Sequence, residues 1–407
     1  MDSAQGTVKA GSSKPAQTEL RIRRMRKRII ILGSTGSIGR NTLSVLAGLD
    51  GDWQVVGLAA GARHRDLAAQ ANQLRPEGIA IAQAEHASAL DASLTYCPRV
   101  HTGPDALVRL VESVPCDCVV CAMVGAEGLS AVLKAVELGR RVALANKEAL
   151  VIAGSLLMPL ARHTGAEILP IDSEHSAVFQ AMQAGRLGEV SKVYLTASGG
   201  PFRTWSEEEM AGVTVEDALK HPTWAMGKKV TIDSATMMNK ALEIVEARWL
   251  FDLRPDQIAV VIHPESIIHS MVEFCDGSLI AQLGAPDMRT PIQYALTYPR
   301  RQVCPSPPLD LFEVGALHLQ RPDPQRFPAL ALGYEVAQRG GTCGSVLNAA
   351  NEAAVEMFRE GAISYRDIAR YTERALNNHP FNEAPTLDDL LAADRWARRE
   401  VARCTTS

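Results

Sequence analysis

The sequence predicts an α/β protein that begins with a doubly wound parallel sheet, continues with an α+β domain and ends in a helical bundle. Three observations support this prediction. Short apolar runs alternate with helical segments up to about residue 150, and the middle of the chain then holds several strands and few helices. After a proline-rich stretch, Pro299 to Pro308, the hydrophobic period is helical to the end.

The first part of the chain follows a strand–helix–strand pattern. Arg28 to Leu32 is an apolar, β-branched run, typical of a strand buried in a parallel sheet. Strands that alternate with helices at this spacing imply right-handed crossovers and one sheet covered on both faces. Further strands are predicted at Gln54–Leu58, Gly78–Ala82, Cys118–Met123 and Arg141–Ala145, with helices at Asn41–Leu49 and Arg65–Leu74.

The rest of the chain divides into a mixed region and a helical region. Strands are predicted at Glu167–Ile171, Lys192–Thr196, Ile258–Ile262 and Ser278–Gln282, with helices at Val178–Ala184 and Met237–Leu250. Four later helices are predicted at Phe327–Arg339, Val346–Arg359, Tyr365–Asn377 and Leu387–Cys404. We therefore expect a disordered basic extension (1–26), a first domain (27–150), a central domain (151–298), a linker (299–314) and a C-terminal helical domain (315–407).

Composition excludes several classes of protein. The 407 residues carry a formal net charge of −4; residues 1–28 have an excess of basic groups and the rest of the chain is net acidic, so a general nucleic-acid binder is not expected. No apolar run is long enough to span a bilayer, which argues against a membrane protein. Eight cysteines are too sparse for a disulfide scaffold and indicate a reducing compartment. We expect a cytoplasmic protein; organelle import directed by the basic leader is the alternative.

A glycine-rich turn follows the first predicted strand. Gly33, Gly36 and Gly39 have the spacing G-x-x-G-x-x-G and stand between a strand and a helix. Such a turn lets the backbone approach a phosphate closely, while the helix N-terminus offers free N–H groups to the anion. The pattern predicts a Rossmann-like dinucleotide site, although a simple glycine turn has the same spacing.

The end of the second predicted strand indicates which dinucleotide binds. Enzymes that use NAD place an acidic residue there to accept a hydrogen bond from the ribose 2′-hydroxyl. This chain has Gly61, Ala62 and Arg63 instead, and no acid. A guanidinium pairs with a 2′-phosphate, so we predict NADPH; the alternative is that Arg63 merely faces solvent.

Two carboxylates lie close together after the strand predicted at 167–171. Asp172 and Glu174 would project from the same face of an extended chain, and such a pair needs a cation between its members. Carboxylate oxygens select Mg²⁺ or Mn²⁺. Helix N-termini also use acidic residues routinely, so the pair is interpreted either as a metal site or as a helix cap.

Further polar groups stand in two later segments. Ser198 opens a glycine-containing loop, and a second segment runs from His221 to Lys229. Beyond it, Asn239 and Glu243 are four residues apart on one predicted helix and share a face. Lys240 stands beside them, so this helix can offer a carboxylate to a metal and an amide and an ammonium to a phosphate.

Together these motifs resemble the 1-deoxy-D-xylulose 5-phosphate reductoisomerase family. The resemblance runs from about Lys27 to the C-terminus and rests on motifs that follow in the family's order. They are Asn146-Lys147-Glu148, Asp172-Ser173-Glu174, the Ser198 loop, His221 to Gly227, Ser234 to Glu243, Leu283 to Arg289 and Leu347 to Glu352. It implies a homodimer that uses NADPH and Mn²⁺ or Mg²⁺ to make 2-C-methyl-D-erythritol 4-phosphate for isoprenoid synthesis, with a central catalytic and dimerisation domain.

The resemblance also implies a role for each matching residue. The NADPH site would comprise Thr35, Gly36, Ser37, Ile38, Gly61, Ala62, Arg63 and Asn146, with Glu148 and Gly227 near the nicotinamide. The metal ligands would be Asp172, Glu174 and Glu243. The phosphorylated sugar would meet Lys147, Ser173, Glu174 and Glu243 at its oxygens, and Ser198, His221, Ser234, Asn239 and Lys240 at its phosphate end. The catalytic group would be Lys147, Glu174, His221 and Trp224, with residues 221–226 as a flap.

Other signals lead to weaker hypotheses. His263 and His269 lack the spacing of a zinc motif, and we expect them to serve sheet packing or an interface. Cys116, Cys118 and Cys121 lie in a predicted strand and are interpreted as buried thiols. The alternative function is another NADPH-dependent dehydrogenase of similar architecture, acting on a semialdehyde or a sugar acid.

Overall fold

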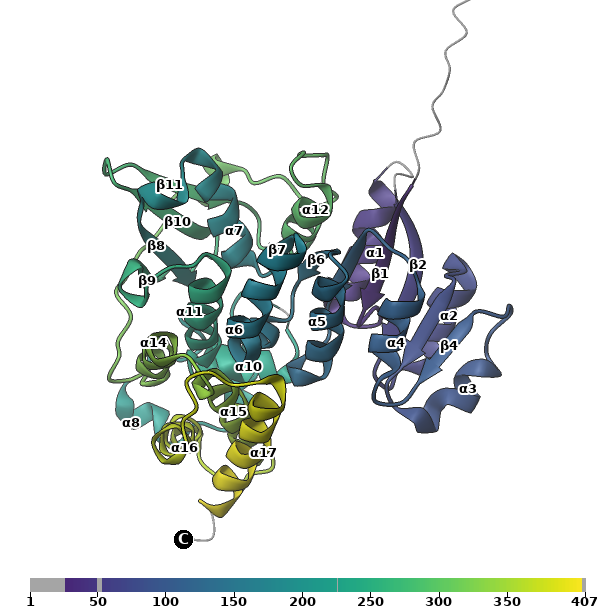
Figure 1. Cartoon of the computed structure of the whole chain (residues 1–407). Helices are drawn as coiled ribbons and strands as arrows, with labels where there is room; N and C mark the ends of the chain where they lie inside the picture. The colour runs from purple at the N-terminus through teal and green to yellow at the C-terminus, as the bar shows by residue number, and fades with distance from the viewer. Residues whose placement is uncertain (1–25, 50–52, 225, 405–407) are drawn as a thin grey trace, which may run out of the picture.

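The computed structural model describes residues 26–49, 53–224 and 226–404, so the basic extension lies almost wholly outside the described residues. Two sheets and a helical bundle make up the fold (Figure 1). The first sheet has seven strands in the order β4-β3-β2-β1-β5-β6-β7, and all neighbours are parallel. Its strands are β1 (Lys27–Leu32), β2 (Trp53–Ala60), β3 (Gly78–Ile81), β4 (Arg99–Thr102), β5 (Cys118–Cys121), β6 (Arg141–Leu144) and β7 (Ile168–Pro170).

The strand order reverses at β1, whose neighbours are β2 on one side and β5 on the other. In a doubly wound sheet, ligands bind beyond the carboxyl ends of the strands at such a reversal. The glycine-rich turn follows β1, so the topology places it at the ligand-binding edge. The prediction of a doubly wound parallel sheet is confirmed.

Two strands of this sheet differ from the sequence prediction. β4 was not predicted, because its four residues include only one aliphatic side chain and three polar ones. The strand near residue 168 was predicted in the central sheet and was placed wrongly, since β7 pairs in parallel with β6. Residues beyond 150 therefore complete the first sheet.

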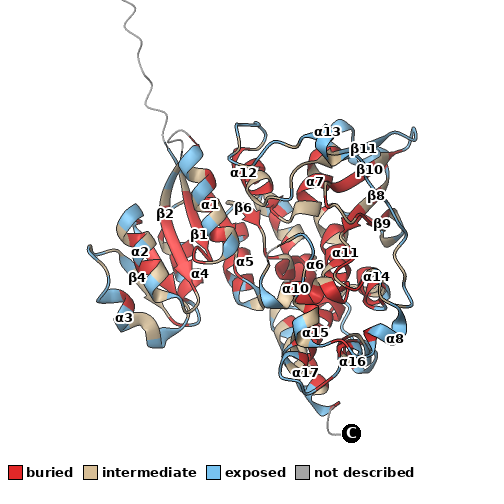
Figure 2. Cartoon of the chain, turned by 180° about the vertical axis from the view of Figure 1, so that it is seen from behind, coloured by how far each residue is buried: buried red, intermediate tan, exposed pale blue. Residues whose placement is uncertain are grey.

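The helices around the first sheet cover both of its faces. They are α1 (Ser37–Gly48), α2 (His64–Leu74), η1 (Ala84–His86), α3 (Ala87–Asp91), α4 (Ala106–Ser113), η2 (Gly125–Gly128) and α5 (Leu129–Glu137). Figure 2 shows the buried residues concentrated on the strands and on the helix faces that meet them. Ile29 to Leu32 are fully buried because β1 is central in the sheet, as its apolar sequence predicts.

The second sheet has four strands in the order β11-β10-β8-β9. Its strands are β8 (Val190–Ala197), β9 (Ile258–Ile262), β10 (Ile268–Phe274) and β11 (Leu279–Leu283), with β8 and β9 parallel and the other pairs antiparallel. The main helices beside it are α7 (Ser173–Ala181), α10 (Lys228–Ala235) and α11 (Met238–Leu250). Short elements are η3 (Met182–Ala184), η4 (Leu187–Glu189), α8 (Glu207–Met210), α9 (Val215–Ala218) and η5 (Pro255–Gln257).

The end of the chain is helical, as predicted, and forms α14 (Ala329–Arg339), α15 (Cys343–Arg359), α16 (Tyr365–Asn378) and α17 (Leu387–Arg403). Two helices before it were not predicted: α12 (Arg289–Thr297) lies in the range assigned to the central domain, and α13 (Leu311–Val314) lies in the range assigned to the linker. No helix or strand occurs between residues 299 and 310, all of which are described, in agreement with the proline-rich composition. α12 packs against the first sheet, because Ile292 and Leu296 share a buried cluster with Ile29 and Ile31.

One long helix connects these parts. α6 (Lys147–Thr164) contacts α5 beside the first sheet, α11 beside the second sheet, and α15 and α17 in the bundle. Its N-terminus therefore lies where the three parts meet. Among the described residues, we find no helix with the length and apolarity needed to cross a membrane.

Candidate active site

A cavity of about 590 Å³ lies between the carboxyl edge of the first sheet and the helices α6, α7, α10 and α11. Most of the predicted site residues line it. They are Gly36, Ser37, Ile38, Arg63, Lys147, Glu148, Asp172, Ser173, Glu174, Ser198, His221, Trp224, Gly227, Ser234, Asn239 and Lys240. One cavity thus joins the predicted dinucleotide loop to the predicted carboxylates.

The glycine turn at one end of the cavity fits a phosphate group. Gly33 has φ +86°, and a Cβ there would come within 2.5 Å of the carbonyl oxygen of Ala122. A Cβ on Gly39 would lie 2.3 Å from the Gly33 carbonyl oxygen, so this turn requires glycine at both positions. No side chain caps α1, the described helix that follows, and its first N–H groups are available to an anion.

Arg63 lies at the N-terminus of α2, where β2 ends. Its Nη1 donates a hydrogen bond to the carbonyl oxygen of Thr35 at 2.9 Å, so the guanidinium reaches across to the glycine turn. The side chain is otherwise exposed, and it lines the cavity. Thr35, Gly61 and Ala62 are not in contact with the cavity; Thr35 acts instead through its carbonyl group.

We expect Arg63→Asp to weaken NADPH binding far more than NADH binding. The change replaces attraction of the 2′-phosphate by repulsion, a loss of about 2 kcal/mol or roughly thirtyfold in Kd. Fluorescence titration with each dinucleotide measures both values, and Arg40→Asp, on the exposed face of α1 and paired with Asp66, is the control. Equal weakening of both dinucleotides would show that Arg63 lies away from the 2′-phosphate.

Three carboxylates converge in the middle of the cavity region. One oxygen from each of Asp172, Glu174 and Glu243 lies within 4.8 Å of the others. The local geometry differs from the predicted extended chain: Asp172 is the N-cap residue of α7, and Glu174 lies in its first turn. Asp172 makes no side-chain cap hydrogen bond, so the helix-cap interpretation is not supported. Glu243 is fully buried on α11 and does not line the cavity itself.

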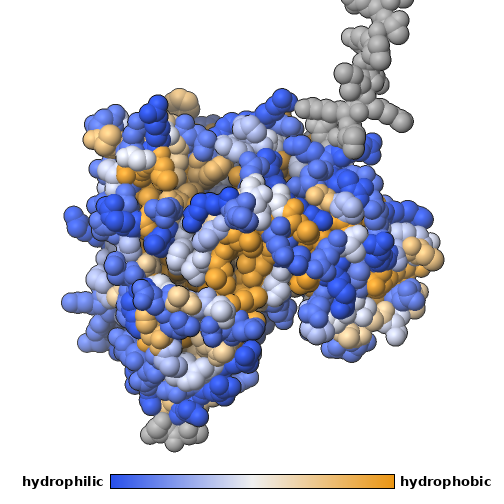
Figure 3. Space-filling model, in the orientation of Figure 1, coloured by the Kyte–Doolittle hydropathy of each residue, from blue (hydrophilic) through white to orange (hydrophobic). Residues whose placement is uncertain are grey.

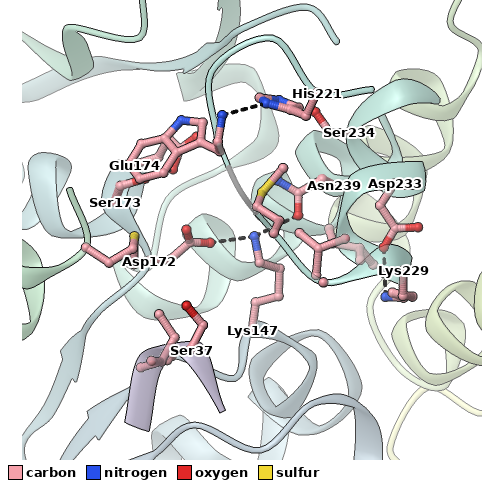
Figure 4. Close-up of a pocket in the computed structure, with 18 of the residues that line it drawn as sticks. Ser37, Lys147, Asp172, Ser173, Glu174, His221, Lys229, Asp233, Ser234 and Asn239 are labelled. Carbon is pink, nitrogen blue, oxygen red and sulfur yellow. Dashed lines mark hydrogen bonds and ion pairs between the residues drawn. The ribbon is translucent and has the colours of Figure 1, made fainter. Parts of the chain in front are cut away.

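Two lysines neutralise these carboxylates. Lys147 Nζ lies 2.5 Å from Asp172 Oδ2 and 3.0 Å from Glu243 Oε1, and it donates to Asn239 Oδ1 at 3.0 Å. Lys240 Nζ pairs with Glu174 Oε1 at 2.8 Å and also contacts Glu243 Oε2. Figure 4 shows Lys147 pointing to Asp172 and to Asn239. The lysines were predicted to face substrate oxygens and phosphate, whereas here their ammonium groups occupy the carboxylate cluster.

Burial and charge shift the pKa values of these groups. Burial raises the pKa of Glu243 to about 7, and the neighbouring Glu174 carboxylate adds to the effect. Burial also opposes ionisation of Glu174, but Lys240 and Lys147 outweigh it and lower its pKa. The surrounding carboxylates, Asp172 first, raise the pKa of Lys147 although burial opposes its charge. The protonation state of Glu243 therefore changes near neutral pH.

The donor set fits a divalent cation. Three carboxylate oxygens within coordination reach, with no sulfur ligand, are what Mg²⁺ and Mn²⁺ bind. Three neighbouring carboxylates need positive charge close to them. In this structure the ammonium groups of Lys147 and Lys240 supply it, by pairing with Asp172 and Glu174. A bound cation would take over that role and release the lysines toward a substrate.

The far end of the cavity contains a serine and the flap histidine. Ser198 Oγ lies 3.2 Å from His221 Nε2, and Gly200 N donates to Ser198 Oγ at 3.3 Å. The backbone N–H of Trp224 donates to His221 Nδ1 at 2.8 Å, so Nε2 carries the proton and can donate. Burial lowers the pKa of His221, which keeps the ring neutral. This end offers hydroxyl and N–H donors to a phosphate.

Some residues are placed otherwise than predicted. Asn146 is buried and caps α6 through its side chain; its Nδ2 donates to Glu148 Oε2 at 3.0 Å and so supports a cavity residue from behind. His269, expected to serve sheet packing or an interface, lines the cavity from β10, with its ring 6.5 Å from that of Trp224. His263 is buried and hydrogen-bonds the carbonyl oxygen of His318, which agrees with a structural role.

Sequence reasoning assigned no role to several other cavity residues. They include Met123, Val124, Lys228, Lys229, Asp233, Met237, Ser266 and Met288. The apolar ones carried no usable signal, because methionines on a helix or after a strand are far more often core residues. Lys228 and Lys229 did carry a usable signal. They are the first two residues of α10, where the helix dipole disfavours positive charge.

Family models match most of the chain. The model described as 1-deoxy-D-xylulose 5-phosphate reductoisomerase matches residues 29–154, and its C-terminal domain model matches residues 168–251. A further model, the DXP reductoisomerase C-terminal domain, matches residues 283–400. Curated relatives agree: the 1-deoxy-D-xylulose 5-phosphate reductoisomerases of Exiguobacterium sibiricum and Pelotomaculum thermopropionicum are each 49% identical, covering 92% and 91% of this chain and 98% and 97% of their own.

Solved structures show the same fold. The reductoisomerase from Zymomonas mobilis in complex with NADPH superposes with a TM-score of 0.88 at 41% identity, covering 94% of this chain and 100% of its own. A DOX-P reductoisomerase in complex with NADPH, fosmidomycin and magnesium gives a TM-score of 0.86 at 40% identity, covering 93% of this chain and 98% of its own. The sequence, the fold and the cavity thus agree, and the chain belongs to the 1-deoxy-D-xylulose 5-phosphate reductoisomerase family.

Proposed function

We propose that the cavity is the place where this chain converts 1-deoxy-D-xylulose 5-phosphate to 2-C-methyl-D-erythritol 4-phosphate, the NADPH- and metal-dependent reaction of its family. The observation that carries the proposal is that one cavity joins the glycine turn, a cluster of three carboxylates of which two line the cavity wall, and a phosphate-type donor end. When bound, NADPH supplies a hydride, and the divalent metal supplies a Lewis acid that polarises substrate oxygens. The product enters isoprenoid synthesis.

The residues of this chain bind and orient those groups. We propose that Asp172, Glu174 and Glu243 hold the metal, and that the turn from Gly36 to Ile38 and Arg63 hold the NADPH phosphates. Asn146 keeps Glu148 in place beside the nicotinamide, with Gly227 at the end of the flap. Thr35 supports Arg63 through its carbonyl group, and Gly61 and Ala62 shape the turn between β2 and Arg63.

The substrate then lies between the metal ligands and the flap. We propose that Lys147, Ser173 and Glu174 contact its carbonyl and hydroxyl oxygens. Ser198, His221, Ser234, Asn239 and Lys240 surround its phosphate end. Trp224, on the flap, covers the carbon skeleton and excludes water, which strengthens every charge interaction in the site.

We propose that Lys147 and Glu174 handle protons during the reaction. Lys147 Nζ stands among Asp172, Glu243 and Asn239, so it can donate hydrogen bonds to an oxygen that gains charge during the rearrangement. Ser173 Oγ donates to Glu174 Oε2 at 2.5 Å, which leaves the other oxygen of Glu174 directed to Lys240. This contact keeps the Glu174 carboxylate ionised and oriented.

NADPH oxidation with 1-deoxy-D-xylulose 5-phosphate tests the function directly. We expect absorbance at the NADPH band to fall only when substrate and Mg²⁺ or Mn²⁺ are both present, with chelator-treated protein inactive until metal is restored. Turnover without metal, or no turnover with it, would contradict the proposal. The dehydrogenase alternative that depends on a cysteine nucleophile lacks support, because none of the described residues lining the cavity is a cysteine.

We also propose that the chain works as a homodimer through β11. This strand lies at the edge of its sheet, where one row of backbone groups has no neighbouring strand among the described residues. Leu279 and Ile280 on β11 are 50% and 38% exposed, and Phe312, on α13 within the predicted linker, is almost fully exposed. Figure 3 shows hydrophobic patches at the upper left, where Figure 1 places β10 and β11. An exposed apolar edge strand is suited to pairing with a second copy.

We expect Ile280→Lys to convert a dimer to a monomer. A charge on the edge strand would have to be buried between two copies, which costs free energy and destabilises the dimer. Light scattering after size exclusion measures the mass. Leu138→Lys, at a somewhat more exposed leucine that follows α5, is the control and should stay dimeric. A wild-type protein that is monomeric at micromolar concentration would refute the proposal.

We propose a cytoplasmic location and either Mg²⁺ or Mn²⁺ as the working metal. All eight cysteines lie in the described part of the chain, and each is a free thiol, which suits a reducing compartment. Magnesium is the metal in the solved relative cited above. The negative body of the chain and the absence of a spanning helix among the described residues favour small-molecule partners over nucleic acid or membrane.

A further inference from the structure

Lys229 stands in an unusual position. It lies in the first turn of α10, two residues after Gly227, the N-cap residue at the end of the flap. That first turn, which the structure describes in full, contains no acidic residue, and Lys228 adds a second positive charge. The helix dipole disfavours ammonium groups at an N-terminus, and residues that break such a rule commonly serve function.

The Lys229 ammonium is directed into a buried ion-pair network. Its Nζ lies 2.8 Å from Asp233 Oδ2 and 3.6 Å from Glu148 Oε1. The side chains of Asp233 and Glu148 are almost wholly buried, and that of Lys229 is 19% exposed at the cavity wall. Burial works against its charge, but the two carboxylates outweigh burial and raise the pKa of Lys229, so it stays an ammonium. Figure 4 shows the ion pair between Lys229 and Asp233 separate from the pair between Lys147 and Asp172.

Both carboxylates are anchored from other parts of the fold. Asn146 Nδ2 donates to Glu148 Oε2 and also to the carbonyl oxygen of Met123, in the loop after β5, at 2.8 Å. Asn351 Nδ2, on α15 in the C-terminal bundle, donates to Asp233 Oδ1 at 2.8 Å. Lys229 therefore joins the base of the flap to the first sheet through Glu148 and, through its own helix, to the bundle.

We propose that Lys229 is a positioning residue that fixes the C-terminal end of the flap against the nicotinamide side of the cofactor site. The inference rests on the proposed use of this cavity for NADPH and substrate. Only Gly227 and Lys228 separate Lys229 from Met226 of the flap, so the ion pairs restrict where that end of the flap can lie. An error of about 1 Å in the placement of reacting groups costs as much as a hundredfold in rate.

Lys229→Met tests the proposal. We expect kcat/KM for 1-deoxy-D-xylulose 5-phosphate to fall by about tenfold or more, while the Kd for NADPH without substrate changes by less than about threefold. The primary isotope effect on kcat/KM, measured with NADPH deuterated at the transferred position, should rise because hydride transfer becomes slower than the other steps. Lys229→Arg keeps the charge and should recover most of the activity.

Lys220→Met is the matched control. Lys220 stands just before the other end of the flap and pairs with Asp217 at 2.9 Å, but its side chain is 72% exposed. The Lys220→Met variant loses one positive charge, as Lys229→Met does, but Lys220 has no buried partner. The kinetics of Lys220→Met should therefore match those of the wild type. Asp233→Asn is a second variant that keeps an acceptor for Asn351 and weakens only the pair with Lys229; it should shift the same quantities in the same direction.

Each outcome bears on the proposal. Lys229→Met and Asp233→Asn with unchanged kcat/KM and isotope effect would overturn it. A lowered melting temperature with unchanged KM and isotope effect in the folded fraction would also overturn it, because that pattern belongs to a merely structural lysine. Inactivity of the wild-type protein toward the substrate would instead refute the proposed function.

Discussion

Glu243→Gln is expected to lower turnover by at least about tenfold, to weaken Mg²⁺ binding and to leave NADPH binding nearly unchanged. Glutamine keeps the shape and one oxygen of the side chain but removes a full negative charge from a fully buried position. Excess Mg²⁺ or Mn²⁺ should recover only part of the activity, because Glu243 also orients Lys147 and Asn239. NADPH is unaffected because the glycine turn belongs to the other sheet.

The pH dependence of metal binding gives this prediction a second readout. The pKa of Glu243 is raised to about 7, so below pH 7 the carboxyl is mostly protonated and a cation must displace that proton. Metal affinity should therefore rise with pH up to about 7 and level off above it. Calorimetry at pH 6 in two buffers of different ionisation enthalpy should show nearly one proton released by the wild type and fewer by Glu243→Gln.

The control for this variant is Glu335→Gln. Glu335 lies on α14 and pairs with Arg339 at 2.6 Å, outside the cavity, so its loss should change neither metal binding nor turnover. Near-normal turnover and metal dependence in Glu243→Gln would remove Glu243 from the metal site. Asp172 and Glu174 would then remain as a pair at a helix N-terminus, without a third ligand.

Local patterns made much of the fold predictable. The position of Gly33, Gly36 and Gly39 where a strand turns into a helix was predicted correctly, because one strand, one turn and one helix carry the whole signal. The shared face of Asn239 and Glu243 was likewise correct, since it depends only on helical periodicity, and the structure joins them by a hydrogen bond of 2.6 Å. Such patterns can be predicted because all the residues that define them lie within a short stretch of sequence.

Long-range partners could not be predicted in the same way. Lys240 pairs with Glu174, 66 residues away, and Lys229 approaches Glu148 from a different helix; neither contact follows from spacing. The short strand β7 was placed in the wrong sheet because an apolar tripeptide does not specify which neighbour it pairs with. These contacts depend on how elements distant in the sequence come together, here α11 with α7, α10 with α6 and β7 with β6.

Lys147→Met is expected to have the opposite effect on the metal from Glu243→Gln, although both variants lose activity. Methionine is similar in length but carries no charge, so Asp172 and Glu243 lose the ammonium that lies 2.5 Å and 3.0 Å from them. A cation that competes for the same carboxylates is thereby removed, and Mg²⁺ affinity measured by calorimetry should be unchanged or tighter. Turnover should fall by about a hundredfold or more, because the substrate oxygens lose their charged donor.

Together, Lys147→Met and Glu243→Gln distinguish residues that hold the metal from residues that act on the substrate. Lys134→Met, on α5 with ion pairs to Glu112 and Glu137, removes a lysine from outside the cavity and should leave turnover unchanged. If Lys147→Met weakened Mg²⁺ binding as Glu243→Gln does, the lysine would serve to order the carboxylates rather than to meet the substrate. Tight metal binding with lost turnover would place its ammonium at the reacting oxygens, where the N-terminus of α6 brings it between the first sheet and the metal ligands.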